Sequence, residues 1–98
     1  MAKKIIWSVR SQKDIIDILG YWNSQTGNKK YSYKLYNEFL RASERISNFN
    51  NIGKTTDILN TRYIIRKNYK IFYRLNKNHI EILTVFDNRR NPNDLKLN

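Results

Sequence analysis

The chain has 98 residues, of which 40% are apolar and 28% are charged, and its formal net charge at pH 7 is +11. This length fits one domain, residues 1–98, and leaves no room for a second hydrophobic core. The absence of cysteine excludes disulfides and thiolate metal sites, and the sequence has neither a signal peptide nor a run of 18 apolar residues. We therefore expect a globular cytoplasmic protein, away from membranes, whose partners are anionic.

The N-terminal segment predicts one strand followed by one helix. Residues 3–8, KKIIWS, form a short run of β-favouring side chains. Apolar residues then recur at helical spacing, and Ser11 followed three residues later by Asp14 is an acidic variant of the capping box. We expect an amphipathic helix that begins at Ser11 and ends near the turn at Gly27.

A second apolar stripe at helical spacing runs from Tyr33 to Phe49, with charged residues on the other faces. Because the connection between the two segments is short, these helices should pair antiparallel. Periodicity then fails over residues 50–61, where Asn, Gly and Thr dominate, and this segment is expected to be a loop.

The C-terminal half changes to a period of two, which is typical of strands. Asn68 and residues 76–78 are turn residues at hairpin spacing, and they separate three apolar runs, residues 62–67, 69–75 and 79–86. The element order β-α-α-β-β-β predicts an α+β fold with the helical hairpin on one face of a mostly antiparallel sheet. The N-terminal strand should join this sheet at an edge or alongside the last strand.

Positive charge is concentrated on the first two strands of the meander. The segment from Arg62 to Lys77, both included, has six basic residues and no acidic residue. Side chains alternate along a strand, so Arg62, Ile64 and Arg66 share one face, as do Lys70, Phe72 and Arg74 of the next strand. We expect these residues to form an open basic face for phosphate contacts and for base stacking on Phe72, while the helices cover the opposite set, Tyr63, Ile65, Ile71, Tyr73 and Leu75. The alternative is a solvated strand face that guards the sheet against aggregation.

Arg89 and Arg90 follow the last strand, where Pro92 ends the ladder. A strand end holds a functional group rigidly and leaves it accessible, so this pair is a candidate for contact with an anionic target. The alternative for one of them is a local ion pair with Asp87 or Asp94, which contributes little at a surface.

The residue types for most catalytic sites are missing. His79 is the only histidine and opens a strand at a turn, and no carboxylates stand at metal-ligand spacing, so we expect no metal and no cofactor. There is no P-loop, dinucleotide fingerprint or nucleophile elbow. Any catalysis would depend on Arg, Lys and Tyr, as in RNA cleavage through the RNA's own 2′-hydroxyl group.

Two segments carry a resemblance to a known family. IIWSVRSQKDIIDILGYW, residues 5–22, resembles the opening of RelE/ParE-type toxins of bacterial type II toxin-antitoxin systems. RYIIRKNYKIFYRLNKNHIEILTVFDNRRNP, residues 62–92, resembles their C-terminal meander still more closely. The resemblance implies a growth-inhibiting toxin neutralised by a cognate antitoxin in a hetero-oligomer. Its target would be DNA gyrase, as for ParE-like members, or messenger RNA on the ribosome, as for RelE-like endoribonucleases.

Arg66, Lys70 and Arg89 or Arg90 match basic positions that RelE-like nucleases use on RNA. The tail after Pro92, NDLKLN, lacks the tyrosine or histidine that serves those nucleases as acid or base, which favours the ParE-like function. In a nuclease, Arg66, Lys70 and Arg89 would be catalytic. For either target the expected contact residues are Arg62, Arg66, Lys67, Lys70, Phe72, Arg74, Arg89 and Arg90.

Two alternatives stay open. One is a ribosome-dependent endoribonuclease with Tyr69 or Tyr73 as the base, and the other is a nucleic-acid-binding module without toxicity. The antitoxin is expected to cover apolar side chains of the last strand, which is apolar on both faces from Ile80 to Val85.

Overall fold

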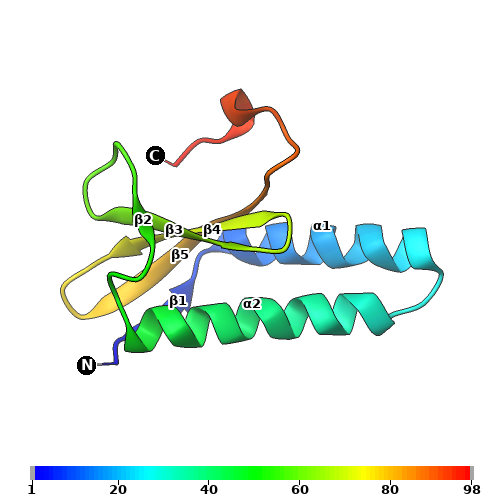
Figure 1. Ribbon diagram of the computed structural model, residues 1–98, viewed down its shortest axis with the longest axis horizontal. Coiled ribbons are helices and arrows are strands. Elements are labelled where there is room, and N and C mark those ends of the chain that lie inside the picture. The colour runs from blue at the N-terminus through cyan, green and yellow to red at the C-terminus, as the bar shows by residue number, and fades with distance from the viewer. Residues whose placement is uncertain (1, 98) are drawn as a thin grey trace.

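The computed structural model describes residues 2–97 and consists of two long helices and a five-stranded sheet (Figure 1). In chain order the elements are β1 Lys4–Trp7, α1 Val9–Thr26, α2 Lys30–Asn48, β2 Lys54–Thr55, β3 Thr61–Arg66, β4 Tyr69–Leu75, β5 His79–Asp87 and the 3₁₀ turn η1 Pro92–Asp94.

The strand order in the sheet is β1-β5-β4-β3-β2. β1 runs parallel to β5, and the other neighbours are antiparallel. The predicted α+β order is confirmed, and so is the position of the N-terminal strand beside the last one. The sequence missed β2, which lies inside the predicted loop and pairs Lys54 with Tyr63 and Thr55 with Arg62.

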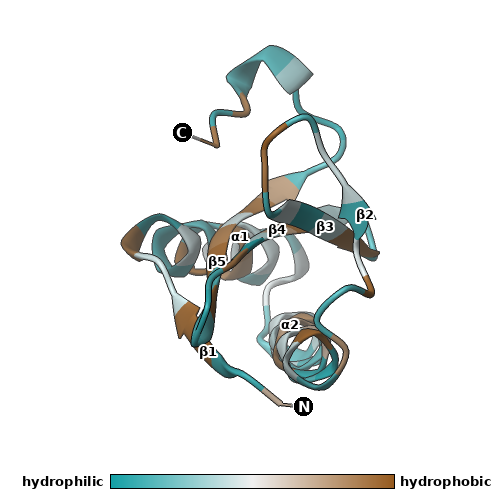
Figure 2. Cartoon of the chain, turned by 90° about the vertical axis from the view of Figure 1, so that its left-hand side faces the viewer, coloured by the Kyte–Doolittle hydropathy of each residue, from teal (hydrophilic) through white to brown (hydrophobic). Residues whose placement is uncertain are grey.

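The core lies between the helices and one face of the sheet, which we call the helix side (Figure 2). Four residues of α2 reach it from one stripe of the helix and have no exposed surface: Leu35, Phe39, Ala42 and Ile46. They share this core with Ile71, Tyr73, Ile80 and Ile82 of the two central strands. The stripe predicted from Tyr33 to Phe49 is wider than the part that is buried, because both of those end residues are exposed.

The start of α1 differs from the prediction. The N-cap is Ser8, whose side chain accepts a hydrogen bond from the Ser11 backbone N–H at 3.0 Å. Asp14 instead accepts from the backbone N–H of Val85 at 3.1 Å and from the Thr84 hydroxyl. β1 pairs with β5 only up to Ile82, so Asp14 satisfies a strand edge that β1 leaves uncovered. The C-terminus at Gly27 is as predicted, with a left-handed φ of 71°.

The orientation of β3 is the reverse of the prediction. Ile64 pairs with Ile71, a core residue, and therefore points to the helix side. Arg62 and Arg66 point the same way, and Ile65 is 43% exposed. A shift of one residue moves every side chain of a strand to the other face. The basic residues of β3 and β4 thus lie on opposite faces, and the single basic face expected from the sequence does not form.

The opposite face of the sheet, which we call the tail side, is covered rather than open. The C-terminal segment, residues 88–97, turns back over it, and the loop between β2 and β3 rises on the same side (Figure 1). Phe72 and Phe86 point to this side, and each is only 4% exposed. Phe72 is therefore not available as the base-stacking platform that the sequence suggested.

Candidate target-binding surface

Aromatic rings with cations above them line the tail side. Tyr63 and Phe72 stand opposite each other on β3 and β4, with ring centroids 5.3 Å apart. The Nζ atom of Lys70 lies 4.9 Å from the centroid of the Tyr63 ring, and the Arg90 guanidinium lies 5.0 Å from that of Phe86. Such contacts contribute about 0.5–1 kcal/mol at exposed sites. Lys70 and Arg90 are therefore held in position over aromatic rings.

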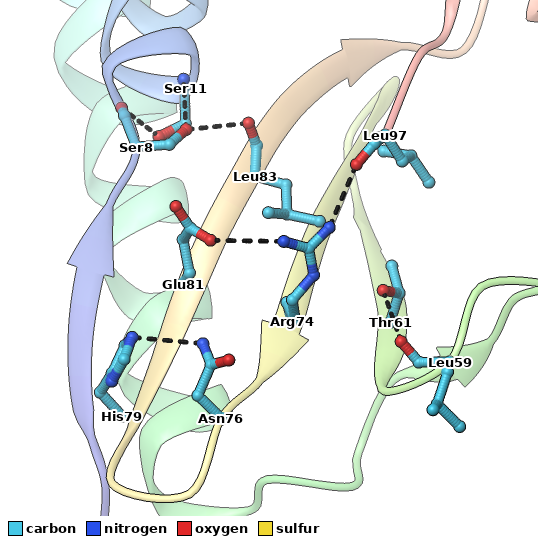
Figure 3. Close-up of polar contacts among 10 residues, drawn as sticks. All are labelled: Ser8, Ser11, Leu59, Thr61, Arg74, Asn76, His79, Glu81, Leu83 and Leu97. Atoms are coloured by element: carbon cyan, nitrogen blue, oxygen red, sulfur yellow. Dashed lines mark hydrogen bonds and ion pairs between the residues drawn. The ribbon is translucent and has the colours of Figure 1, made fainter.

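Arg74 lies on the same face near the start of β5 and is tied into the fold (Figure 3). Its Nη1 atom is 3.8 Å from Glu81 Oε1, and its Nη2 atom donates to the Leu97 carbonyl at 3.2 Å. This residue holds the C-terminal tail against the sheet. Its role in the described structure is internal, and it is a weaker candidate for target contact than Lys70.

Arg89 is anchored by the last residue of β5. Its Nε and Nη2 atoms donate to the two Asp87 carboxylate oxygens at 3.0 and 2.8 Å, and its guanidinium lies 6.0 Å from the centroid of the Trp22 ring. These hydrogen bonds from Arg89 lower the pKa of Asp87 and raise the pKa of Arg89. The local ion pair considered for one arginine is thus present, and it orients Arg89 rather than removing it from the surface, since the side chain stays 53% exposed.

Arg90 forms only a loose pair with Asp94, at 3.9 Å between exposed side chains. Both arginines line a cleft of about 390 Å³ between α1 and the end of β5. Its other polar lining residues include Asp14, Asp17, Tyr21 and Tyr69. The end of β5 is therefore the place where cations, a concave surface and a rigid strand coincide.

The basic residues of β3 lie elsewhere. Arg62 Nη1 donates to the Gly53 carbonyl at 2.8 Å and holds the β2 segment against β3. Arg66 Nη1 donates to the carbonyl of Ile65, and Lys67 is exposed in the β3–β4 turn, where its φ is 55°. The eight residues predicted for target contact are thus dispersed: Lys70, Phe72, Arg74 and Arg90 on the tail side, Arg89 at the cleft, and Arg62, Arg66 and Lys67 toward the helices and the turn.

The two tyrosines considered as catalytic bases are core residues. The Tyr69 hydroxyl accepts a hydrogen bond from Trp22 Nε1 at 2.9 Å, and the Tyr73 hydroxyl accepts from Gly53 N–H and donates to the Asn50 carbonyl, both at 2.9 Å. Burial raises the pKa of both hydroxyls. A buried, hydrogen-bonded phenol with a raised pKa is unsuited to take a proton from RNA at neutral pH.

His79 is also remote from the arginines. It starts β5, and its Nε2 atom is 3.2 Å from the Asn76 side-chain amide, whereas Arg89 follows the opposite end of the same strand. Within residues 2–97 no three His, Asp or Glu side chains stand close enough to hold a metal ion. Sequence reasoning placed Tyr63 under the helices and missed Phe86 as a part of the tail side, because their positions beside Lys70 depend on the register between strands.

Comparison with known proteins identifies the family of the chain. The family model for the ParE toxin of the type II toxin-antitoxin system parDE matches residues 5–92. The chain belongs to the ParE toxin family. The resemblance to RelE/ParE toxins noted in the sequence is therefore confirmed.

A solved structure described as the chromosomal ParDE TA system from P. aeruginosa has the same fold as this ParE family member. The TM-score is 0.75 at 13% sequence identity, over 88% of this chain and 96% of the other. No curated protein matches the chain. In the part of the chain that the structure describes, neither helix is long and apolar enough to cross a membrane.

Proposed function

We propose that this chain is the toxin of a two-component toxin-antitoxin module, and that it inhibits growth in the cytoplasm by binding DNA gyrase without cutting nucleic acid. Its membership of the ParE family supports this proposal most strongly. The burial of Tyr69 and Tyr73 also supports it, because the endoribonuclease alternative drawn from the sequence needs one of them as a base.

The end of β5 is the surface that we assign to the target. Arg89 is oriented by Asp87, and Arg90 lies over the Phe86 ring beside the same cleft. Oriented guanidinium groups suit carboxylates of a partner surface. Because Asp14, Asp17 and Asp87 line the same cleft, we assign this contact to the two arginines and not to the cleft as a whole. Lys70 extends this cationic surface onto the tail side, since it pairs with Phe86 across the strands.

We assign the antitoxin to a different surface. The last strand, which the sequence favoured, has little apolar surface left, because Ile80, Ile82 and Val85 belong to the core. Exposed apolar residues gather instead in a groove of about 540 Å³ between β1, α1 and α2. Its lining includes Trp7, Ile16, Leu19, Tyr36 and Leu40. Such a groove fits an amphipathic helix, and acidic flanks on that helix would complement the +11 net charge of the toxin.

A supercoiling assay with purified gyrase tests the target. The chain should inhibit supercoiling, and the double variant R89Q/R90Q should lose at least about 10-fold in potency, or ~1.4 kcal/mol of binding free energy. The matched control is K13Q/K77Q, which removes two exposed charges from α1 and the β4–β5 turn. Thermal unfolding of all three proteins checks that they remain folded. Gyrase that is unaffected by micromolar toxin would refute the proposal.

The ribosome-dependent endoribonuclease remains the second candidate because of one contact. Tyr63 is the tyrosine beneath Lys70 on the tail side, and the Lys70 Nζ atom lies 4.9 Å from the centroid of its ring, so a phenol and a cation for phosphate stand together. Cleavage sites in messenger RNA from expressing cells would support this function, and Y63F should then abolish them. The same RNA, uncut in cells whose growth is arrested, would exclude it.

Growth assays test the toxin assignment itself. A host that expresses the chain alone should stop growing, and co-expression of the adjacent small gene should restore growth. L40E places a charge in the groove between β1, α1 and α2, where Leu40 is 39% exposed. It should abolish this rescue while toxicity persists. Normal growth with the chain alone would instead indicate the nucleic-acid-binding module without toxicity.

A further inference from the structure

Four cations stand on one side of α2. Lys30, Lys34, Arg41 and Arg45 are spaced by four, seven and four residues, which places them on one stripe of a helix. We call them the α2 basic row. At 1.5 Å per residue they extend over roughly 22 Å along the helix axis. The stripe faces away from the buried stripe of Leu35, Phe39, Ala42 and Ile46.

The row makes few contacts within the described structure. All four side chains belong to exposed residues. Within residues 2–97 their single ion pair joins Arg41 Nη1 to Glu38 Oε1 at 4.0 Å, and Arg41 itself is 74% exposed. Arg45 lies over the Phe49 ring at 5.4 Å. The row therefore differs from Arg74 and Arg89, whose charges are tied to carboxylates and carbonyls inside the molecule.

The β3–β4 turn extends the row with one more cation. Lys34, Arg41 and Lys67 line one pocket of about 210 Å³ together with Glu38. Lys67 therefore stands beside the row although it is remote in sequence. Two acidic side chains, Glu38 and Glu44, accompany these five cations, so the surface keeps a positive excess.

The N-terminus of α2 carries cations where the helix dipole disfavours them. Lys29 is the N-cap residue and makes no side-chain capping bond, although the Asn28 side chain accepts a hydrogen bond from the Lys30 backbone N–H at 2.9 Å, and the first turn has no acidic residue. The positive charges of Lys29 and Lys30 at this end oppose the helix dipole, where an acidic residue would be favoured. Natural proteins break such local rules chiefly at functional sites.

We propose that the α2 basic row with Lys67 binds the phosphate backbone of duplex DNA without reading its sequence. A straight, rigid row of cations matches the regular phosphates of a duplex. Single strands need aromatic platforms on which bases can stack, but Tyr31 beside the row is half-buried and packs edge-on against Trp22 at 4.9 Å. The exposed Phe49 ring already has the Arg45 guanidinium over it. A protein partner would need an interface core depleted in charge, which this surface does not offer.

Fluorescence anisotropy with a short labelled duplex, repeated over a range of salt concentrations and without gyrase, tests the proposal. K34Q/R41Q should weaken binding about 10-fold or more, and the slope of log K against log salt should become shallower by about 1.8, or 0.9 for each phosphate that the variant no longer neutralises. Glutamine keeps the helix propensity of both positions. K13Q/K77Q is again the charge-matched control, and K30Q/R45Q is a second row variant in case the first is unstable.

An equal loss in the control variant would overturn the proposal, because binding would then follow net charge alone. An unchanged salt slope in both row variants would overturn it as well. Tighter binding to the single strand of the same sequence would show a different ligand. Since gyrase is absent, failure of this experiment leaves the proposed gyrase inhibition untouched, and failure of the supercoiling assay leaves the DNA-binding proposal standing.

Discussion

The helix side of the sheet is sealed by two long helices, whereas the tail side is covered by residues 88–97 and the β2–β3 loop. On the helix side, aliphatic and aromatic residues from α1, α2 and the central strands form one continuous core. On the tail side, Lys70 lies over the Tyr63 ring and Arg90 over the Phe86 ring. The difference shows how a small, strongly basic chain buries a second apolar layer with side chains that still present charge to a partner.

The strongest test of this comparison is the loss of one phenylalanine from each face. Phe39 has no exposed surface and Phe72 is 4% exposed. F39A and F72A should each lower the free energy of unfolding by about 3–5 kcal/mol, because both leave a cavity. Chemical denaturation measures both values. A cost for F72A below about 1 kcal/mol, the value for a surface substitution, would mean that the tail does not seal its face.

A hydroxyl deletion tests how the helix side holds the loop before β2. Y73F removes the group that bridges Gly53 N–H and the Asn50 carbonyl, and should cost about 1–3 kcal/mol. The approach is close, since a Cβ at Gly53 would lie 2.8 Å from the Tyr73 ring. Y63F is the control, because among residues 2–97 the Tyr63 hydroxyl has no hydrogen bond, and it should be nearly neutral. Equal effects of the two variants would contradict the bridge.

Removal of the tail tests its contribution directly. Deletion of residues 92–98 takes away two half-buried leucines, Leu95 and Leu97, and the carbonyl that binds Arg74. We expect a loss of about 1–2 kcal/mol after the entropy of the freed segment is counted. F72A should then cost less in the shortened chain than in the full chain, as a double-mutant cycle would measure. Additive effects would show that the tail and Phe72 do not interact.

The smallest expected effect concerns pH. Arg89 lowers the pKa of Asp87 below its ordinary value of 3.8, so the folded state binds this proton less tightly than the unfolded state. The stabilisation is present above that value and is lost as the pH falls through the lower pKa of the folded state. NMR titration of the Asp87 carboxyl carbon measures it, and R89Q should move the midpoint upward. An unmoved midpoint would mean that the pair does not form in solution.

Much of the fold could be predicted because it depends on local pattern. The two helices, the meander and the turn at Gly27 follow from periodicity and turn residues in this chain. The capping of α1 could not be assigned in the same way, since Ser8 and Ser11 both precede the apolar stripe. Ser8 is the cap because its hydroxyl accepts from the Ser11 backbone N–H, while Asp14 binds the uncovered edge of β5. That contact joins residues 71 positions apart.

The candidate site was predicted less well than the fold. Lys70 and Arg90 lie on the same side of the sheet, but Arg89 lies at the cleft beside α1, Phe72 is covered and Arg62 holds a neighbouring strand. Tyr69 and Tyr73 were predicted as possible bases, but both are buried. Residue type and spacing indicate which side chains can carry charge or a proton. They do not indicate which of these side chains form hydrogen bonds within the fold.

The sequence by itself determined the element order, the positive charge and the resemblance to RelE/ParE toxins, because these reside in composition and local periodicity. Only the tertiary structure decided where the charges of β3 point. Ile64 and Ile65 are adjacent and equally apolar, so alternation alone permits either face. The pairing of Ile64 with Ile71 fixes the face to which Ile64 points, so that Arg62 and Arg66 point toward the helices. Lys70 and Arg90 lie on the opposite side of the sheet.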